Sequence, residues 1–400
     1  MVKNMINLTS KEDIKFIYKT ANSILKECSD IDAVNLLEEK YAPNNSQLLY
    51  NVAIKIAKSK ILMNSIDKKI SITIVFAVYN EHNRMLDSNM HPNGENFIEN
   101  KIEQLNWLFE NVRDLVDWKM IIVDDGCPNH SGLIAQNIID RKFKNYNIEI
   151  LFLENSIREN LPPARNLTST DESQKGGSII YGMWKASLEN STLDHIIVYT
   201  DADLSIHLSQ IGLLINDIVN SDVKVSIGSK RERKSVLLKS KSRNLRGMFF
   251  IYLWKQLIPD LGYLNDTQCP LKAFRADLVH DIIEDNIESK FAFDIELLLK
   301  AQLNQTNKNI PNIKSQPIAV IDSEAESTTI ALNPYLTMLK SIVKIYQKYL
   351  PPNEKSEKLA HFLKTLDEND WKKLIDDIPK ENIGRKVDDF EYDFLLSKIT

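Results

Sequence analysis

The segment at residues 196–205, Ile-Ile-Val-Tyr-Thr-Asp-Ala-Asp-Leu-Ser, constrains the fold of this chain more than any other. Four apolar or aromatic residues that favour a β-strand run into two aspartates, Asp201 and Asp203. A buried strand that ends at Asp-x-Asp places both side chains at the carboxyl edge of a sheet, where open α/β sheets bind ligands. Two hard oxygen donors there suit a divalent cation that also binds substrate phosphates. The alternative is that the pair caps the helix that follows.

Two earlier apolar runs end in the same way. Residues 70–78 run into Tyr79-Asn80-Glu81, and residues 120–123 run into Asp124-Asp125-Gly126. Residues 148–153 predict a third strand, and helical repeats separate the strands at 101–112, 133–143 and 176–188. Strands that alternate with helices imply right-handed βαβ units, so we expect an α/β fold with a mostly parallel sheet flanked by helices. The acidic strand ends would then share one crevice.

The remaining segments suggest a three-part organisation. Apolar residues recur at helical spacing in 8–66, with a break at 42–45, and again in 335–349, 355–366 and 368–378. Between them we expect a helix at 208–219, strands at 223–228 and 318–321, and a helix at 297–302, whereas 266–275 predicts a polar turn running into an apolar stretch. We therefore predict an N-terminal helical extension at 1–69, an α/β domain at 70–350 and a C-terminal helical extension at 351–400.

The composition limits which cellular compartment and which binding partners we expect. The net charge of -5 gives no reason to expect nucleic acid as a partner, and three widely spaced cysteines argue against a disulfide framework. The N-terminus has no apolar signal-peptide core, and no run of about 18 apolar residues predicts a spanning helix. We therefore expect a cytoplasmic protein without a transmembrane segment.

Basic residues are concentrated after the strand at 223–228. Eight of the 17 residues from 230 to 246 are cationic, namely Lys230, Arg231, Arg233, Lys234, Lys239, Lys241, Arg243 and Arg246. Most such runs are solvated surface. In a chain of net charge -5, a run beside the expected crevice favours an anion site, with phosphate or pyrophosphate as the anion.

Seven short motifs, in this order, resemble the family 2 glycosyltransferases with the GT-A fold. More narrowly, they are similar to the branch that includes dolichyl-phosphate glucosyltransferase and related polyprenyl-phosphate sugar transferases. The motifs lie at residues 78–81, 123–126, 175–178, 201–205, 227–231, 266–275 and 293–296. The resemblance spans about residues 70–350. It implies a nucleotide-diphospho-sugar transferase that inverts the anomeric centre.

The resemblance also implies a donor site. Residues that would hold the nucleotide of a sugar donor such as UDP-glucose are Tyr79, Asn80, Glu81, Asp125, Lys175, Gly176, Gly177 and Asp201. Asp203 would bind Mg²⁺ or Mn²⁺ on the donor diphosphate, assisted by Asp201. Such a metal neutralises charge that develops on the leaving diphosphate.

The acceptor side is implied by the later motifs. Asp266 and Gln268 would line the donor-sugar and acceptor pocket, and Asp294 or Glu296 would act as base, so the three carboxylates are the catalytic candidates. The first-turn acids Asp294 and Glu296 also suit a helix dipole without any catalysis. Cations that would engage an acceptor phosphate are Lys272, Arg275 and members of the 230–246 run, namely Lys230, Arg231 and Arg243. A phosphate acceptor needs little base catalysis, whereas a hydroxyl must lose its proton to a carboxylate.

Several features leave the acceptor open between a polyprenyl phosphate and a soluble molecule. Residues 82–100 are long and polar for the family, Cys127 stands where a serine is usual, and Pro270 stands where glycine is commoner. The helical ends lie outside the core pattern and suggest a protein partner, an oligomer or peripheral membrane contact. Two other functions stay open, a nucleotidyltransferase of the same fold and a non-catalytic nucleotide-sugar-binding protein. Tyr79-Asn80-Glu81 counts against the first, because those enzymes usually have a Gly-rich loop there.

Overall fold

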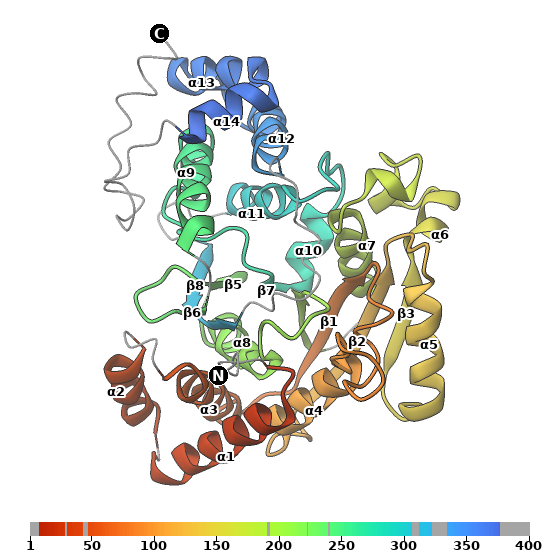
Figure 1. The fold of residues 1–400 in the computed structure, drawn as a ribbon, viewed down its shortest axis with the longest axis vertical. Helices are drawn as coiled ribbons and strands as arrows, with labels where there is room; N and C mark the ends of the chain where they lie inside the picture. Colours follow the sequence, from red (N-terminus) through yellow and green to blue (C-terminus); the bar gives the residue numbers. More distant parts are fainter. Residues whose placement is uncertain are drawn as a thin grey trace.

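A seven-stranded sheet with helices on both faces organises the chain (Figure 1). This computed structural model describes residues 8–28, 30–42, 47–189, 193–221, 223–238, 241–305, 312–321 and 334–376, without the side chains of 241–246 and 334. The strands are β1 (Ile70–Val78), β2 (Val116–Asp124), β3 (Ile148–Phe152), β4 (Asp194–Thr200), β5 (Val225–Ser229), β6 (Val236–Leu238), β7 (Leu271–Arg275), β8 (Ile313–Pro317) and β9 (Ala319–Ile321). Their order is β3-β2-β1-β4-β7-β5-β8, and β6 pairs separately with β9.

Helices precede, connect and follow these strands. They are α1 (Lys11–Glu27), α2 (Ile31–Tyr41), α3 (Leu48–Asn64), α4 (Phe97–Phe109), α5 (Ser131–Lys142), α6 (Leu153–Arg158), α7 (Gly176–Ser187), α8 (Ile211–Asn220), α9 (Lys241–Leu257), α10 (Ala276–Ile282), α11 (Phe293–Leu303), α12 (Pro334–Tyr349), α13 (Glu354–Thr365) and α14 (Glu368–Asp376). The predicted α/β class, with a mostly parallel sheet flanked by helices, is confirmed.

Successive residues of β1 contribute to two separate cores. Ile74 and Phe76 belong to the core on the side of α1, α3, α4 and α8. Val75 lies in the other core, together with residues of α7 and α9–α14. Side chains alternate between the faces of a strand, so a strand covered on both faces needs apolar residues throughout. This double burial explains the continuous apolar run that predicted the strand.

One strand of the sheet runs against the others. β7 pairs antiparallel with both β4 and β5, whereas the remaining pairs of the main sheet are parallel. The sequence predicted only a polar turn and an apolar stretch here, because Leu-Lys-Ala-Phe-Arg has a lysine at its second position. The edge strand β8 was also missed, since Ile-Lys-Ser-Gln-Pro is largely polar and ends in proline, which edge strands tolerate.

The terminal helices pack on opposite faces of the sheet. Val52 and Ile56 of α3 are fully buried in one core, and Leu363 and Trp371 of α13 and α14 are buried in the other. In Figure 1 the red N-terminal helices lie at the lower end of the view and the blue C-terminal helices at the upper end. The predicted boundaries at 69/70 and 350/351 stay a prediction.

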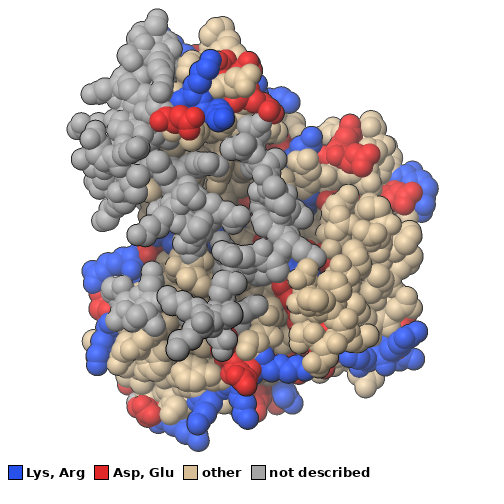
Figure 2. Space-filling model, viewed as in Figure 1, with Lys and Arg blue, Asp and Glu red and all other residues tan. Residues whose placement is uncertain are grey.

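The surface and the helix lengths add two observations. On the face in Figure 2, Lys and Arg side chains lie along the lower edge, interspersed with Asp and Glu, so its described part has mixed charge there. Among the described residues, no helix is both long enough and apolar enough to cross a membrane.

Candidate functional site

The carboxyl ends of β1, β2 and β4 meet at one edge of the sheet. Val78 is in register with Asp124, and Val75 is in register with Tyr199. Because β7 is reversed, its first residue, Leu271, pairs with Thr200 at the end of β4. The segment before β7 is therefore brought to the same edge as Asp201. As the sequence predicted, the acidic strand ends share one region.

Asp201 forms an ion pair with Lys175 at the start of α7. Lys175 has a left-handed backbone, with φ of 79°, and its amide N–H donates to Asp125 over 2.9 Å. The hydroxyls of Ser173 and Ser178 donate to the other carboxylate oxygen of Asp125, each over 2.6 Å. Burial would lower the pKa of Lys175, but Asp201 and Asp294 hold it above its ordinary value. Asp125 thus fixes the backbone that presents Lys175 to Asp201.

Asp203 is held by a second set of contacts. Its Oδ1 accepts from the Ser205 hydroxyl at 2.7 Å and from the Ser205 amide at 3.1 Å. Its backbone carbonyl accepts from Lys101 Nζ at 3.0 Å. Burial alone would raise the pKa of Asp203, but Arg84, Ser205 and Lys101 hold it below its ordinary value. The side chain is therefore an ionised carboxylate at neutral pH, as a metal ligand must be.

Arg84 joins this aspartate to two further acids. Its Nη2 lies 2.9 and 3.0 Å from the two carboxylate oxygens of Glu95 and 3.6 Å from Asp203 Oδ2, and its Nη1 lies 3.1 Å from Glu81 Oε2. Burial, together with Asp203 and Glu95, raises the pKa of Glu81 to about 7 despite the opposing effect of Arg84. We call Arg84, Glu81, Glu95 and Asp203 the Arg84 cluster.

Three members of this region, Arg84, Glu95 and Lys101, were not predicted from the sequence. The first two lie in the long polar segment that the family resemblance left unexplained. Lys101 had a detectable signal, since it falls on the apolar face of α4 with Ile98 and Ile102 and is fully buried. A lysine at such a position needs a buried acceptor, which is here the Asp203 carbonyl.

Lys272 and Asp294 form a buried ion pair on the opposite side of Asp201. Lys272 Nζ lies 2.8 Å from Asp294 Oδ1 and donates to the Cys269 carbonyl at 2.6 Å. Burial raises the pKa of Asp294 and lowers the pKa of Lys272. Asp266 is buried too, and its oxygens accept from the amides of Lys230 and Gln268 at 2.9 and 3.2 Å. Asp266 therefore organises the turns that carry the predicted acceptor-side residues.

The basic run divides into two groups. Lys230 and Arg231 follow β5 at the site edge, whereas Arg233 pairs with Glu39 and Lys234 with both Glu38 and Glu39 of α2. These last two cations therefore hold the N-terminal helices, and an anion site formed by other cations of the run stays a prediction. Arg243 lies in α9, at a position whose side chain is outside the description.

Glu296 is placed elsewhere, contrary to its predicted role as a candidate base. Its carboxylate accepts from the amides of Ile287 and Glu288, each at 2.8 Å, and from the Tyr349 hydroxyl at 2.6 Å. The side chain is fully buried. Each oxygen already has a donor, so Glu296 anchors the loop before α11 and the end of α12. Only Asp294 of the two predicted bases lies beside Lys272.

The first motif and the glycines have different environments. Tyr79 is exposed, and Asn80 has φ of 58° and accepts from the Asn129 amide at 2.9 Å. The resemblance implies that Gly176 and Gly177 help to hold the nucleotide, and this stays a prediction. In the structure, a Cβ at Gly176 would lie 2.5 Å from the Lys290 carbonyl oxygen, and the Gly177 amide donates to the Ser289 carbonyl at 2.8 Å. Gly176 therefore lets α7 pack closely against residues 289–290, and a Cβ at Gly177 would meet Ser173 Oγ at 2.8 Å.

The donor set fits a divalent cation that substrate helps to bind. The described residues contain no group of three or more His, Cys, Asp or Glu side chains able to hold a metal. Mg²⁺ is commonly bound by one or two carboxylates plus substrate phosphates and water. Asp201 and Asp203 supply two such carboxylates, each partly exposed at the sheet edge. They suit a cation that arrives with a diphosphate.

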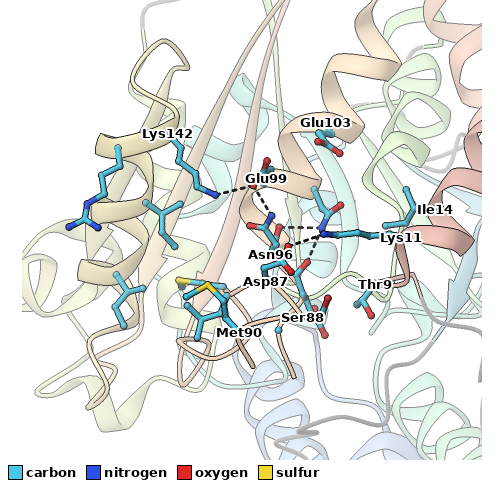
Figure 3. A pocket seen from close by; sticks show the side chains of 18 of the residues that line it. Thr9, Lys11, Ile14, Asp87, Ser88, Met90, Asn96, Glu99, Glu103 and Lys142 are labelled. Atoms are coloured by element: carbon cyan, nitrogen blue, oxygen red, sulfur yellow. Dashed lines mark hydrogen bonds and ion pairs between the residues drawn. The ribbon is translucent and has the colours of Figure 1, made fainter. Parts of the chain in front are cut away.

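A separate cleft of about 1140 Å³ lies beyond the Arg84 cluster, between α1, residues 85–96, α4 and α5. Figure 3 shows Lys11 directed at Asp87 and Lys142 directed at Glu99, which Asn96 also contacts. Glu95 belongs both to this cleft and to the Arg84 cluster. The cleft and the sheet edge are therefore neighbours across one loop.

Comparisons with known proteins give limited likenesses. No protein-family model and no curated protein matches the sequence. Among solved structures, the chain is similar to glucosyl-3-phosphoglycerate synthase of Mycobacterium tuberculosis, with 14% identity, a TM-score of 0.45 and coverage of 74% of this chain and 86% of that one. Mannosyl-3-phosphoglycerate synthase of Rubrobacter xylanophilus is similar with 11% identity and a TM-score of 0.43, over 73% of this chain and 76% of that one. A mannosyltransferase of Pyrobaculum calidifontis, in complex with GDP-Man and Mn²⁺, is similar with 12% identity and a TM-score of 0.41, over 86% of this chain and 83% of that one. At these TM-scores the function has to be inferred from the residues of the chain itself.

Proposed function

We propose that this protein is a metal-dependent, inverting glycosyltransferase of the GT-A type in family 2. It transfers a hexose, with glucose as the first candidate, from a UDP-sugar to an acceptor that bears a phosphate or a hydroxyl. The observation that carries this proposal is the Asp201–Asp203 pair at the carboxyl end of β4, with Lys175 paired to Asp201. A carboxylate pair beside a lysine at this edge suits a metal-bound diphosphate.

The donor side follows from these contacts. Asp203 would bind Mg²⁺ or Mn²⁺ with help from Asp201, and a bound metal would neutralise charge on the diphosphate. Lys175 would bind a phosphate oxygen, since its ammonium group already lies at Asp201. The exposed Tyr79 ring and the polar groups of Asn80 and Glu81 would contact the base and the ribose. Asp125, with all three of its donors inside the protein, is a positioning residue for Lys175.

The acceptor side is built around Lys272 and Asp294. With a hydroxyl acceptor, Asp294 would take the proton, because burial keeps its affinity for protons high. With a phosphate acceptor, Lys230, Arg231 and Lys272 would bind the anion and Asp294 would only position Lys272. Asp266 holds Lys230 and Gln268 in place through their amides.

Donor binding and turnover test the proposal. Purified protein is incubated with a panel of UDP- and GDP-sugars, Mn²⁺ or EDTA, and acceptors that include phosphoglyceric acid, which is present with UDP-glucose and Mn²⁺ in one structure of the mycobacterial enzyme. We expect metal-dependent release of the nucleoside diphosphate, and Asp203→Asn should reduce it by roughly 100-fold or more. Asp260→Asn, at an exposed site, is the matched control.

Two outcomes would overturn the proposal. Full activity in Asp203→Asn would remove the metal assignment. Release of pyrophosphate from a nucleoside triphosphate and a sugar phosphate, without transfer from any nucleotide sugar, would instead identify a nucleotidyltransferase.

A further inference from the structure

Arg84 lies beside Asp203, the proposed metal-binding carboxylate. It is buried and lies within 4 Å of three carboxylates, those of Glu81, Glu95 and Asp203. A buried cation of this kind stabilises acids that would otherwise repel one another. Its guanidinium group also lies close to Asp203 Oδ2, an oxygen that a divalent cation would need as a ligand.

The three contacts of Arg84 are unequal. Both carboxylate oxygens of Glu95 accept from Arg84 Nη2, at 2.9 and 3.0 Å. Glu81 Oε2 lies 3.1 Å from Nη1, whereas Asp203 Oδ2 lies 3.6 Å from Nη2. The close contacts fix Arg84 on Glu95 and Glu81. The long contact is the one that a competing cation can replace without displacing the arginine from its other partners.

The rest of Asp203 is fixed independently of Arg84. Lys101 holds its backbone carbonyl and Ser205 holds Oδ1, so Oδ2 is the oxygen whose partner can change. Glu95, for its part, is tied into the loop, since its amide donates to the Arg84 carbonyl at 3.0 Å. The carboxylate is thus held in place for a ligand while its charge is balanced by a neighbour.

We infer that Arg84 is an internal counter-cation, which balances Asp203 in the metal-free protein and competes with a divalent cation for that carboxylate. Glu95 sets the strength of this competition, because it holds Arg84 at a distance from Asp203. Arg84 and Glu95 are positioning residues in this scheme. The inference rests on the proposed function only in taking Asp203 as the metal ligand.

Direct Mn²⁺ binding to the full chain tests it, by electron paramagnetic resonance titration with and without UDP. Arg84→Gln should bind Mn²⁺ about tenfold more tightly than wild type, equivalent to about 1.4 kcal/mol. Glu95→Gln should bind it several-fold more weakly, because Arg84 then moves its charge to Asp203. A purely structural role for the pair would weaken binding in both variants. Lys142→Gln loses a cation from an exposed site and should leave the affinity unchanged.

A thermal readout covers the case of a poorly folding variant. Arg84→Gln should melt earlier than wild type without metal and gain more from added Mn²⁺. If Arg84→Gln does not fold, the double variant Arg84→Gln/Glu95→Gln removes both charges and should still bind Mn²⁺ at least as tightly as wild type.

Unchanged or weaker Mn²⁺ binding in the folded Arg84 variant overturns the inference while leaving the glycosyltransferase proposal intact. If wild type binds no Mn²⁺ and lacks transferase activity but Arg84→Gln binds it, the inference stands and the proposed function falls. If neither wild type nor Arg84→Gln binds Mn²⁺, the inference is overturned.

Discussion

At the residue scale, the site depends on charges that are buried in pairs. Lys272 is fully buried and Asp294 is nearly so, and the two form an ion pair. They are too far apart in the sequence for a local spacing pattern to predict this contact. The family resemblance named both residues but gave them separate roles. Their contact arises because β7 is reversed and its second residue faces the start of α11, a relation that local sequence patterns do not contain. The identity of the acids was thus predictable, whereas their partners were not.

We predict strong coupling between Lys272 and Asp294. Lys272→Met and Asp294→Asn should each lower the free energy of unfolding by about 3–5 kcal/mol, because each leaves one buried charge without its partner. The double variant should lose much less than the sum of the two. Urea unfolding of the four proteins measures the difference. Additive losses would mean that the two side chains do not share a pair.

At the element scale, α2 and α3 support the loop between β5 and β6. Glu38 of α2 is buried between Lys55 and Lys58 of α3, and Lys55 also donates to the Pro317 carbonyl at 2.8 Å. From the loop, Lys234 pairs with Glu38 and with the neighbouring Glu39. The sequence predicted the helices from their apolar periodicity but assigned them no part in the site. Ion pairs between elements almost 200 residues apart leave no periodic pattern, so this link could not be predicted.

Glu38→Gln tests this support. Loss of its charge leaves the buried Lys55 without a counter-ion, so we expect a loss of about 3–5 kcal/mol in unfolding free energy. We also expect trypsin to cleave faster after Arg231, Arg233 or Lys234. The control is Glu39→Gln, since Glu39 is 41% exposed and its ion pairs should contribute less than about 1 kcal/mol. Equal effects of the two substitutions would refute a special role for the buried acid.

At the scale of the whole molecule, the sheet separates two cores, and the terminal helices complete one core each. The continuous apolar strands β1, β2 and β4 were predictable because double burial requires them. The position of α3 was not, because it depends on a close approach to α8. A Cβ at Gly212 of α8 would lie 2.5 Å from Ser59 Oγ and 2.9 Å from the Ser59 carbonyl.

Gly212→Ala should therefore separate α3 from α8. We expect a loss of about 1–3 kcal/mol, because the added methyl meets backbone as well as side chain. Thermal melting would measure the loss, and amide hydrogen exchange should rise mainly in α3. A melting temperature equal to that of wild type would mean that the N-terminal helices do not depend on this contact.

The reversed strand β7 has a consequence for how such a site can diversify. Because of this reversal, the site receives the beginning of β7 but the ends of β1, β2 and β4. The residues on the β1, β2 and β4 side of the site thus precede residue 206 in the chain, and those on the β7 side, which form its second wall, follow residue 229. Insertions in the turn that enters β7 would reshape the second wall and leave Asp201 and Asp203 unchanged. Natural selection could therefore alter recognition on the β7 side without rebuilding the proposed metal-binding pair.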